Sequence, residues 1–202
     1  LALPTRALAE ALAAEWNAQG EHIDLGALYL TRLANVAIDK VADARDGLAD
    51  ELARYCETDL ICHIAEEPEE LIALEEGHWA PVREWAADTL GVILVTTEGV
   101  RAAPQPDASL DAARDYALSL DDFRLAALVY ACALYGSALL AMAVCEGALP
   151  AEEAFEMSRL DEAWQMARWG EDEEALAAAE AKRAEARAIG KWFGGLAGQT
   201  QR

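Results

Sequence analysis

The first residues in this sequence that could do chemistry are Glu75 and His78, whose Glu-x-x-His spacing puts a carboxylate and an imidazole on one helical face. Helical bundles that hold two iron ions use two copies of this motif and two further glutamates. One copy occurs here, and Gly77 and Pro81 weaken the helix around it. His78 also follows Leu74 by four residues, on the apolar stripe of the same helix. We therefore interpret His78 as a packed core residue and predict no metal site and no cofactor.

Two other residue combinations are weaker signals of catalysis. Cys62 and His63 are neighbours in a segment with strand character, and neighbouring side chains of a strand point to opposite faces. They are therefore not expected to form a nucleophile–base pair. The glycine-rich segment 194–198 lacks the preceding strand and following helix that a phosphate-binding loop requires. We predict that the protein is not an enzyme.

A binding function is favoured most by residues 169–174, in the last fifth of the chain. Trp169 and Gly170 stop one amphipathic helix, and four acidic residues then open the next: Glu171, Asp172, Glu173 and Glu174. A carboxylate at a helix N-terminus gains about 0.3–1 kcal/mol from the helix dipole, which accounts for one or two of the four. We predict that these six residues bind a partner protein. For Trp169, a buried anchor position is the stronger alternative, and Gly170 is expected to need a positive φ.

Composition limits the classes of partner. The 202 residues carry a formal net charge of −21, which repels nucleic acid and anionic membranes and attracts basic protein surfaces. The same charge favours a soluble monomer, and solubility alone is an alternative reason for it. Four cysteines without a Cys-x-x-Cys pair indicate free thiols in a reducing compartment. No targeting leader is visible, so we expect the bacterial cytoplasm, or the mitochondrial matrix if the source is eukaryotic.

Hydrophobic periodicity predicts a mainly α, multihelical fold with a small β element. The two expected strands lie near 58–64 and 91–97, and Pro81 is expected to split the helical pattern between them. The uncharged run from 125 to 145 predicts one buried helix over about 122–146, in preference to a membrane span. Helices over 151–168 and 171–189 follow. We expect a mixed region at 1–103, a helical region at 104–190 and a flexible tail at 191–202.

Residue groups spread over nearly the whole chain resemble one protein family, the assembly chaperones that handle the α subunit of the mitochondrial and α-proteobacterial F1-ATPase. The groups are Leu3-Pro4-Thr5 with Glu15-Trp16; Leu30-Thr31-Arg32-Leu33-Ala34-Asn35 with Ile38-Asp39; Tyr55 and Thr58-Asp59-Leu60-Ile61-Cys62 with Glu66-Glu67-Pro68; Trp79-Ala80-Pro81 with Glu84-Trp85; and Ser158-Arg159-Leu160-Asp161-Glu162 and Trp164-Gln165 with Trp169-Gly170 and Glu173.

This resemblance implies a chaperone without enzymatic activity that binds the unassembled F1 α subunit and covers its β-facing surface until the β subunit displaces it. It also implies that Glu173 is the main contact residue, presented by the Trp169–Gly170 junction. His63 and residues 166–168 depart from the family pattern, and the family's N-terminal β-rich segment is absent from this sequence. Two alternatives remain open: an acidic helical adaptor for a different client, and a carboxylate–metal enzyme that uses Glu75, His78 and the acidic residues 171–174.

Overall fold

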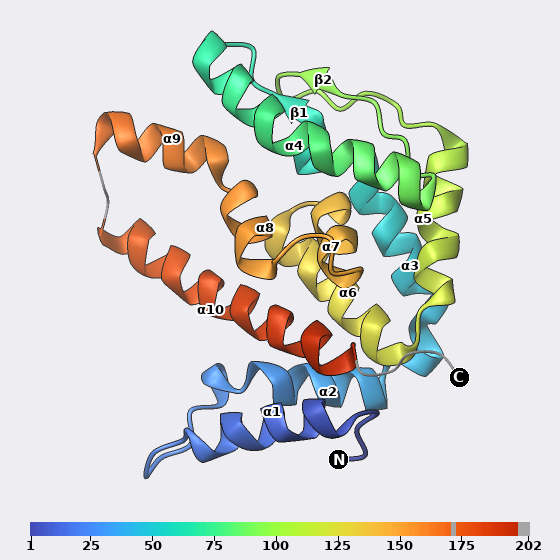
Figure 1. Cartoon of the computed structure of the whole chain (residues 1–202), viewed down its shortest axis with the longest axis vertical. Coiled ribbons are helices and arrows are strands. Elements are labelled where there is room, and N and C mark those ends of the chain that lie inside the picture. Colours follow the sequence, from blue (N-terminus) through green and yellow to red (C-terminus); the bar gives the residue numbers. More distant parts are fainter. Residues whose placement is uncertain (171–172, 198–202) are drawn as a thin grey trace.

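The computed structural model of the chain describes residues 1–170 and 173–197, and these form ten α-helices and two very short strands (Figure 1). In chain order the helices are α1 (Arg6–Asn17), α2 (Tyr29–Asp39), α3 (Val41–Glu57), α4 (Glu69–Leu90), α5 (Asp107–Ser119), α6 (Asp122–Tyr135), α7 (Ala138–Cys145), α8 (Ala151–Met157), α9 (Leu160–Trp169) and α10 (Glu173–Leu196). The predicted mainly α fold with a small β element is confirmed. Within the described part of the chain, no helix is long and apolar enough to cross a bilayer.

The β element is smaller than the sequence predicts. Strands β1 (His63–Ile64) and β2 (Thr97–Glu98) pair in parallel and lie inside or next to the two expected segments. The rest of the first segment is different because the Asp59 side chain accepts a hydrogen bond from the Ile61 amide and starts a 3₁₀ turn at Leu60–Cys62. The residue types of the two segments therefore predict the positions of the strands correctly, but they predict strands that are longer than those in the structure.

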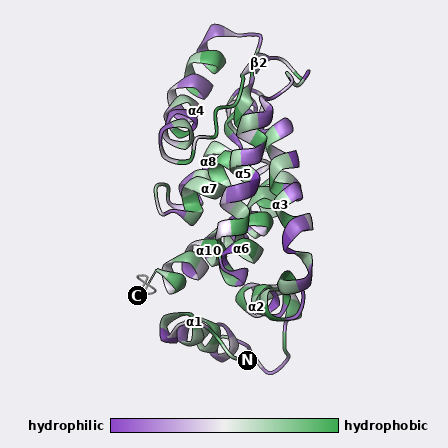
Figure 2. Cartoon of the chain, turned by 90° about the vertical axis from the view of Figure 1, so that its right-hand side faces the viewer, coloured by the Kyte–Doolittle hydropathy of each residue, from purple (hydrophilic) through white to green (hydrophobic). Residues whose placement is uncertain are grey.

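The core is built around α6 and α7, which the sequence predicts as one buried helix. That prediction is wrong in one respect, because the helix breaks at Gly136, whose φ of 66° is left-handed. Ser137 then caps α7 by accepting a hydrogen bond from the Leu140 amide at 3.0 Å. Every residue of α7 is buried. Figure 2 shows the hydrophilic residues concentrated on outer helices such as α3 and α5.

Two further helix boundaries differ from the predicted ones. Pro81 does not split α4, which runs unbroken from Glu69 to Leu90, because the burial of Trp79 and Val82 on either side of the proline outweighs the local cost of proline in a helix. The expected helix over 151–168 is divided into α8 and α9 at Ser158. The Ser158 hydroxyl donates a hydrogen bond to the Phe155 carbonyl at 2.7 Å. This carbonyl then competes less well for a backbone amide of the next helical turn.

The flexible tail is predicted to begin at residue 191. This prediction is wrong for residues 191–196, because α10 continues to Leu196. Trp192 and Leu196 are fully buried, and the Trp192 indole donates to the Phe123 carbonyl at 3.0 Å. Gly195 in this segment permits close packing of α10 on α1. A Cβ on Gly195 would lie 3.1 Å from the backbone of Leu8. Residues 198–202 lie outside the described residues.

Several motif residues turn out to join elements rather than face a partner. The Glu15 carboxylate accepts hydrogen bonds from the Leu30 and Thr31 amides at 2.8 and 3.0 Å, so it caps α2 from α1. The Trp16 indole donates to the Thr31 hydroxyl at 2.9 Å. These contacts fix the first two helices against each other.

Asp59 makes the corresponding link at the centre of the molecule. Its side chain is fully buried, accepts from the Ile61 amide, and also accepts from the Leu139 amide in the first turn of α7 at 3.0 Å. Burial raises the pKa of Asp59 from its ordinary 3.8 to about 6, although these hydrogen bonds and one from Ser137 oppose the rise.

We predict that Asp59→Asn changes the pH dependence of stability. A raised folded pKa means that the protonated acid stabilises the native state, and this contribution disappears as the pH rises through 6. The free energy of unfolding of the parent minus that of the variant should therefore fall by about 1.4 kcal/mol between pH 5 and 7.5. Urea unfolding across this range measures the difference. A difference that grows with pH would show that the amide donors, and not burial, control the ionisation.

Candidate partner-binding site

The junction between α9 and α10 is the structural setting of the predicted binding residues. Helix α9 ends at Gly170, whose amide donates to the Met166 carbonyl at 3.0 Å and whose φ and ψ are 100° and 162°. This confirms the predicted positive φ, and the combination is open essentially to glycine alone. Glu173 and Glu174 form the first turn of α10 and are exposed, whereas Glu171 and Asp172 lie outside the described residues.

Trp169 lies on the surface, which overturns the buried-anchor interpretation. Its side chain is 75% exposed, because α9 packs on α4 along one side and has no buried residue of its own. The Trp169 ring meets the Trp164 ring edge to face at 6.2 Å. On Trp164, the Arg168 guanidinium lies 3.8 Å from the ring centroid. These aromatic side chains belong to α9, the orange helix that precedes the glycine junction in Figure 1.

These aromatic side chains form one wall of a groove of about 830 Å³ that α9 shares with α4 and the β1–β2 pair. The opposite walls come from segments about 60 to 110 positions earlier in the chain. The residues that define its chemistry are Glu67, Glu75, Val100, Asp161, Trp164 and Trp169. None of the described residues that line the groove is a lysine or an arginine. The groove is therefore acidic and apolar at once.

Glu75 connects the groove to the β element. Its side chain is 3% exposed, and its Oε2 accepts a hydrogen bond from the Ala65 amide at 2.7 Å, directly after β1. Burial raises the pKa of Glu75, and the nearby Asp161 carboxylate adds to the rise. His78 is exposed, so the predicted core position for this histidine is wrong, and the buried member of the pair is Glu75.

Other candidate chemistry is not assembled in the described residues. No group of three or more histidine, cysteine, aspartate or glutamate side chains there is arranged to hold a metal ion. The Cys62 thiol is buried, which raises its pKa to about 12, whereas the His63 ring lies against the Gly99 carbonyl with Nδ1 3.1 Å from the oxygen. A thiol with so high a pKa is a poor nucleophile at neutral pH.

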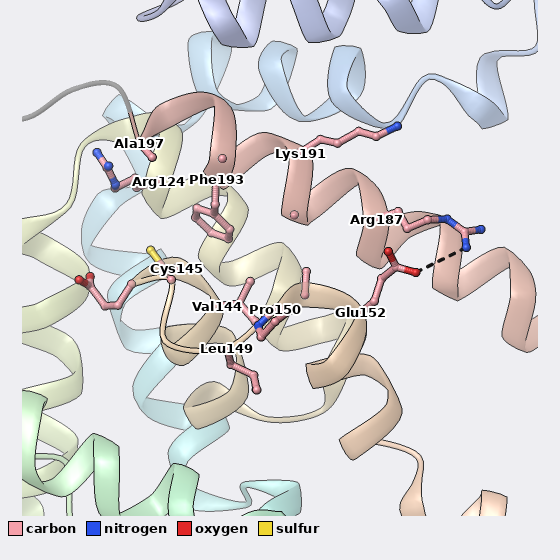
Figure 3. A pocket seen from close by; sticks show the side chains of 15 residues that line it. Arg124, Val144, Cys145, Leu149, Pro150, Glu152, Arg187, Lys191, Phe193 and Ala197 are labelled. Carbon is pink, nitrogen blue, oxygen red and sulfur yellow. Dashed lines mark ion pairs between the residues drawn. The ribbon is translucent and has the colours of Figure 1, made fainter.

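A second cavity of about 790 Å³ lies between α7, α8 and α10 (Figure 3). Arg124, Arg187 and Lys191 line it together with the carboxylates of Glu146 and Glu152. Arg187 pairs with Glu152 at 3.7 Å, the dashed contact in Figure 3. Charges of both signs thus partly cancel in this cavity, in contrast to the groove beside α9.

Comparison with known proteins identifies the family to which this fold belongs. A family model described as ATP12 chaperone protein matches residues 1–87. The crystal structure of Atp12 from Paracoccus denitrificans is 43% identical, with a TM-score of 0.88 over 96% of this chain and 83% of that chain. The chain belongs to the Atp12 chaperone family. The family predicted from the sequence motifs is therefore confirmed.

Two further relatives widen the comparison. The Atu1473 protein of Agrobacterium tumefaciens is 37% identical with a TM-score of 0.90, over 97% of this chain and 74% of that chain. Protein atp12, mitochondrial, of Schizosaccharomyces pombe is 27% identical over 178 residues, or 83% of this chain. The chain spans 61% of the length of that yeast protein.

The junction itself gives a testable prediction. A Cβ at Gly170 meets no atom within 4 Å, so Gly170→Ala should act through backbone strain alone and lower the free energy of unfolding by about 1–2 kcal/mol. Gly77→Ala is the matched control, because Gly77 also has open space but lies inside α4. The control should gain about 0.5–1 kcal/mol in the same urea titration. Equal stability of the two variants would refute the strained junction.

Proposed function

We propose that this chain is a chaperone of F1-ATPase assembly that binds the unassembled α subunit and covers the surface that later meets the β subunit. The observation that carries the proposal is membership of the Atp12 chaperone family together with an exposed tryptophan beside an acidic helix start. The client is then released when the β subunit competes for the same surface. We further propose that the chain acts as a monomer in the bacterial cytoplasm.

The physical need for such a protein follows from the client. A subunit of a hexamer exposes a large apolar interface before its neighbours arrive, and that interface associates wrongly or aggregates. A holder must therefore offer apolar contacts that compete with aggregation but release to the correct neighbour. The exposed Trp169 supplies such a contact, and the net charge of −21 keeps the holder itself soluble.

The proposal is tested by mixing the isolated F1 α subunit with an equimolar amount of the chain, without nucleotide. We expect light scattering from aggregating α subunit to be suppressed and a one-to-one complex to elute in gel filtration. Addition of the β subunit should then dissociate the complex. Unchanged aggregation and no complex would contradict the proposal and favour the alternative, an acidic adaptor for another client.

Within this proposal, Glu173→Lys should weaken binding of the α subunit about tenfold, a loss of about 1.4 kcal/mol, because it reverses an exposed charge that faces a basic partner. Isothermal titration calorimetry measures the change in Kd. Asp43→Lys is a matched control, since Asp43 is also an exposed acid in the first turn of a helix, α3, elsewhere on the molecule.

Both substitutions remove the same favourable helix-dipole interaction, so both should lower the melting temperature by a similar small amount. A specific loss of binding in Glu173→Lys, with Asp43→Lys equal to the parent, supports the contact role. Equal Kd values for the two variants would remove Glu173 from the binding surface.

A further inference from the structure

We infer that the groove between α4, α9 and the β1–β2 pair binds a client segment that carries both arginine or lysine side chains and apolar ones. This inference rests on the proposed function and specifies the chemistry of the client. It assigns the recognition to the groove walls, in addition to the acidic start of α10.

The apolar part of the argument comes from two exposed side chains at the groove. Trp169 is 75% exposed and Val100 is fully exposed, on opposite walls that α9 and the segment after β2 provide. Exposed apolar groups of this size on a concave surface are typical of protein-binding sites. The walls are fixed by backbone and ring contacts, because Glu75 holds the residue after β1 and Trp164 supports Trp169.

The charge of the groove selects the client's polar side chains. Glu67, Glu75 and Asp161 line it, and no lysine or arginine does within the described residues. Oδ1 of Asp161 accepts from the Gln165 side-chain amide at 2.9 Å, and Oε2 of Glu75 accepts from the Ala65 amide at 2.7 Å. Carboxylates at the wall of an apolar groove favour a guanidinium or ammonium group.

The aromatic wall already holds a cation in the same way. The Arg168 guanidinium lies over the Trp164 ring, and the neighbouring Trp169 ring offers an unoccupied face of the same kind. Cation–π contact prefers the tryptophan ring and the arginine side chain. The exposed Trp169 ring is therefore suited to a client arginine.

Charge also argues against the other occupants. A second copy of this chain carries a net charge of −21 and is repelled from an acidic groove, as is nucleic acid. The cavity of Figure 3, where basic and acidic residues are mixed, lacks this selectivity. A basic and apolar protein segment is the occupant that the groove fits.

The test uses the variants Asp161→Lys and Trp169→Ala, with Asp43→Lys and Leu25→Ala as matched controls for a charge and for an exposed apolar side chain. Each protein is titrated with the F1 α subunit and with two hexapeptides, one of alternating leucine and arginine and one of alternating leucine and glutamate. Tryptophan fluorescence and calorimetry report binding, and circular dichroism confirms folding. Light scattering reports self-association.

We expect Asp161→Lys and Trp169→Ala to weaken binding of both the α subunit and the arginine peptide about tenfold or more, with the controls unchanged and the glutamate peptide not bound. Binding of the arginine peptide without binding of the α subunit would overturn the proposed client and keep the groove chemistry. Equal α-subunit affinity in all variants would overturn the groove inference alone. A dimer that Trp169→Ala disrupts would assign the groove to a second copy and also overturn it.

Discussion

The arrangement of this molecule depends on a buried carboxylate. Asp59 is enclosed on all sides and holds the Leu60–Cys62 turn against the first turn of α7. A second hydrogen bond, from the Leu60 amide to the Gly136 carbonyl at 3.1 Å, fixes the same turn to the break between α6 and α7. A buried polar group is stable only while its partners stay in place, so this link restricts the central helices to one arrangement. Strand β1 follows directly from the turn.

The position of the groove depends on these hydrogen bonds around Asp59. The turn leads into β1, the Ala65 amide after β1 is held by Glu75 of α4, and the Trp79 indole of the same helix donates to the Met157 carbonyl at 2.9 Å. Met157 ends α8, and α9 begins three residues later. Each wall of the groove is therefore fixed to the core, whereas the side chains that face outward are free to contact a client. A chaperone needs this combination, because a rigid apolar surface loses little entropy on binding.

Features determined by local chemistry were predictable from the sequence. Thr5 caps α1 by accepting from the Leu8 amide, the two short strands fall near the expected segments, and Gly170 has a positive φ. For the Thr5 cap and for Gly170 the relevant contacts lie within a few residues. The family resemblance was also readable, because motifs in fixed order do not require knowledge of the packing.

Features determined by packing were not predictable. The exposure of Trp169 depends on what α9 packs against, and a tryptophan on an amphipathic pattern is compatible with either face. The burial of Trp192 required α10 to extend through a glycine-rich segment, where Gly195 permits close contact with α1. The groove combines segments around 60–79, 99–100 and 161–169, and their juxtaposition has no local signal. Periodicity finds helices but does not say which face another helix covers.

We propose that this chain covers the β-facing surface of the F1 α subunit. Hydrogen–deuterium exchange of the α subunit, alone and with the chain, tests it most directly, since protected amides report the covered surface. We expect protection of the α-subunit segments that contact the β subunit in assembled F1, together with protection of α9 and the groove in this chain. Protection confined to other faces of the α subunit would contradict it.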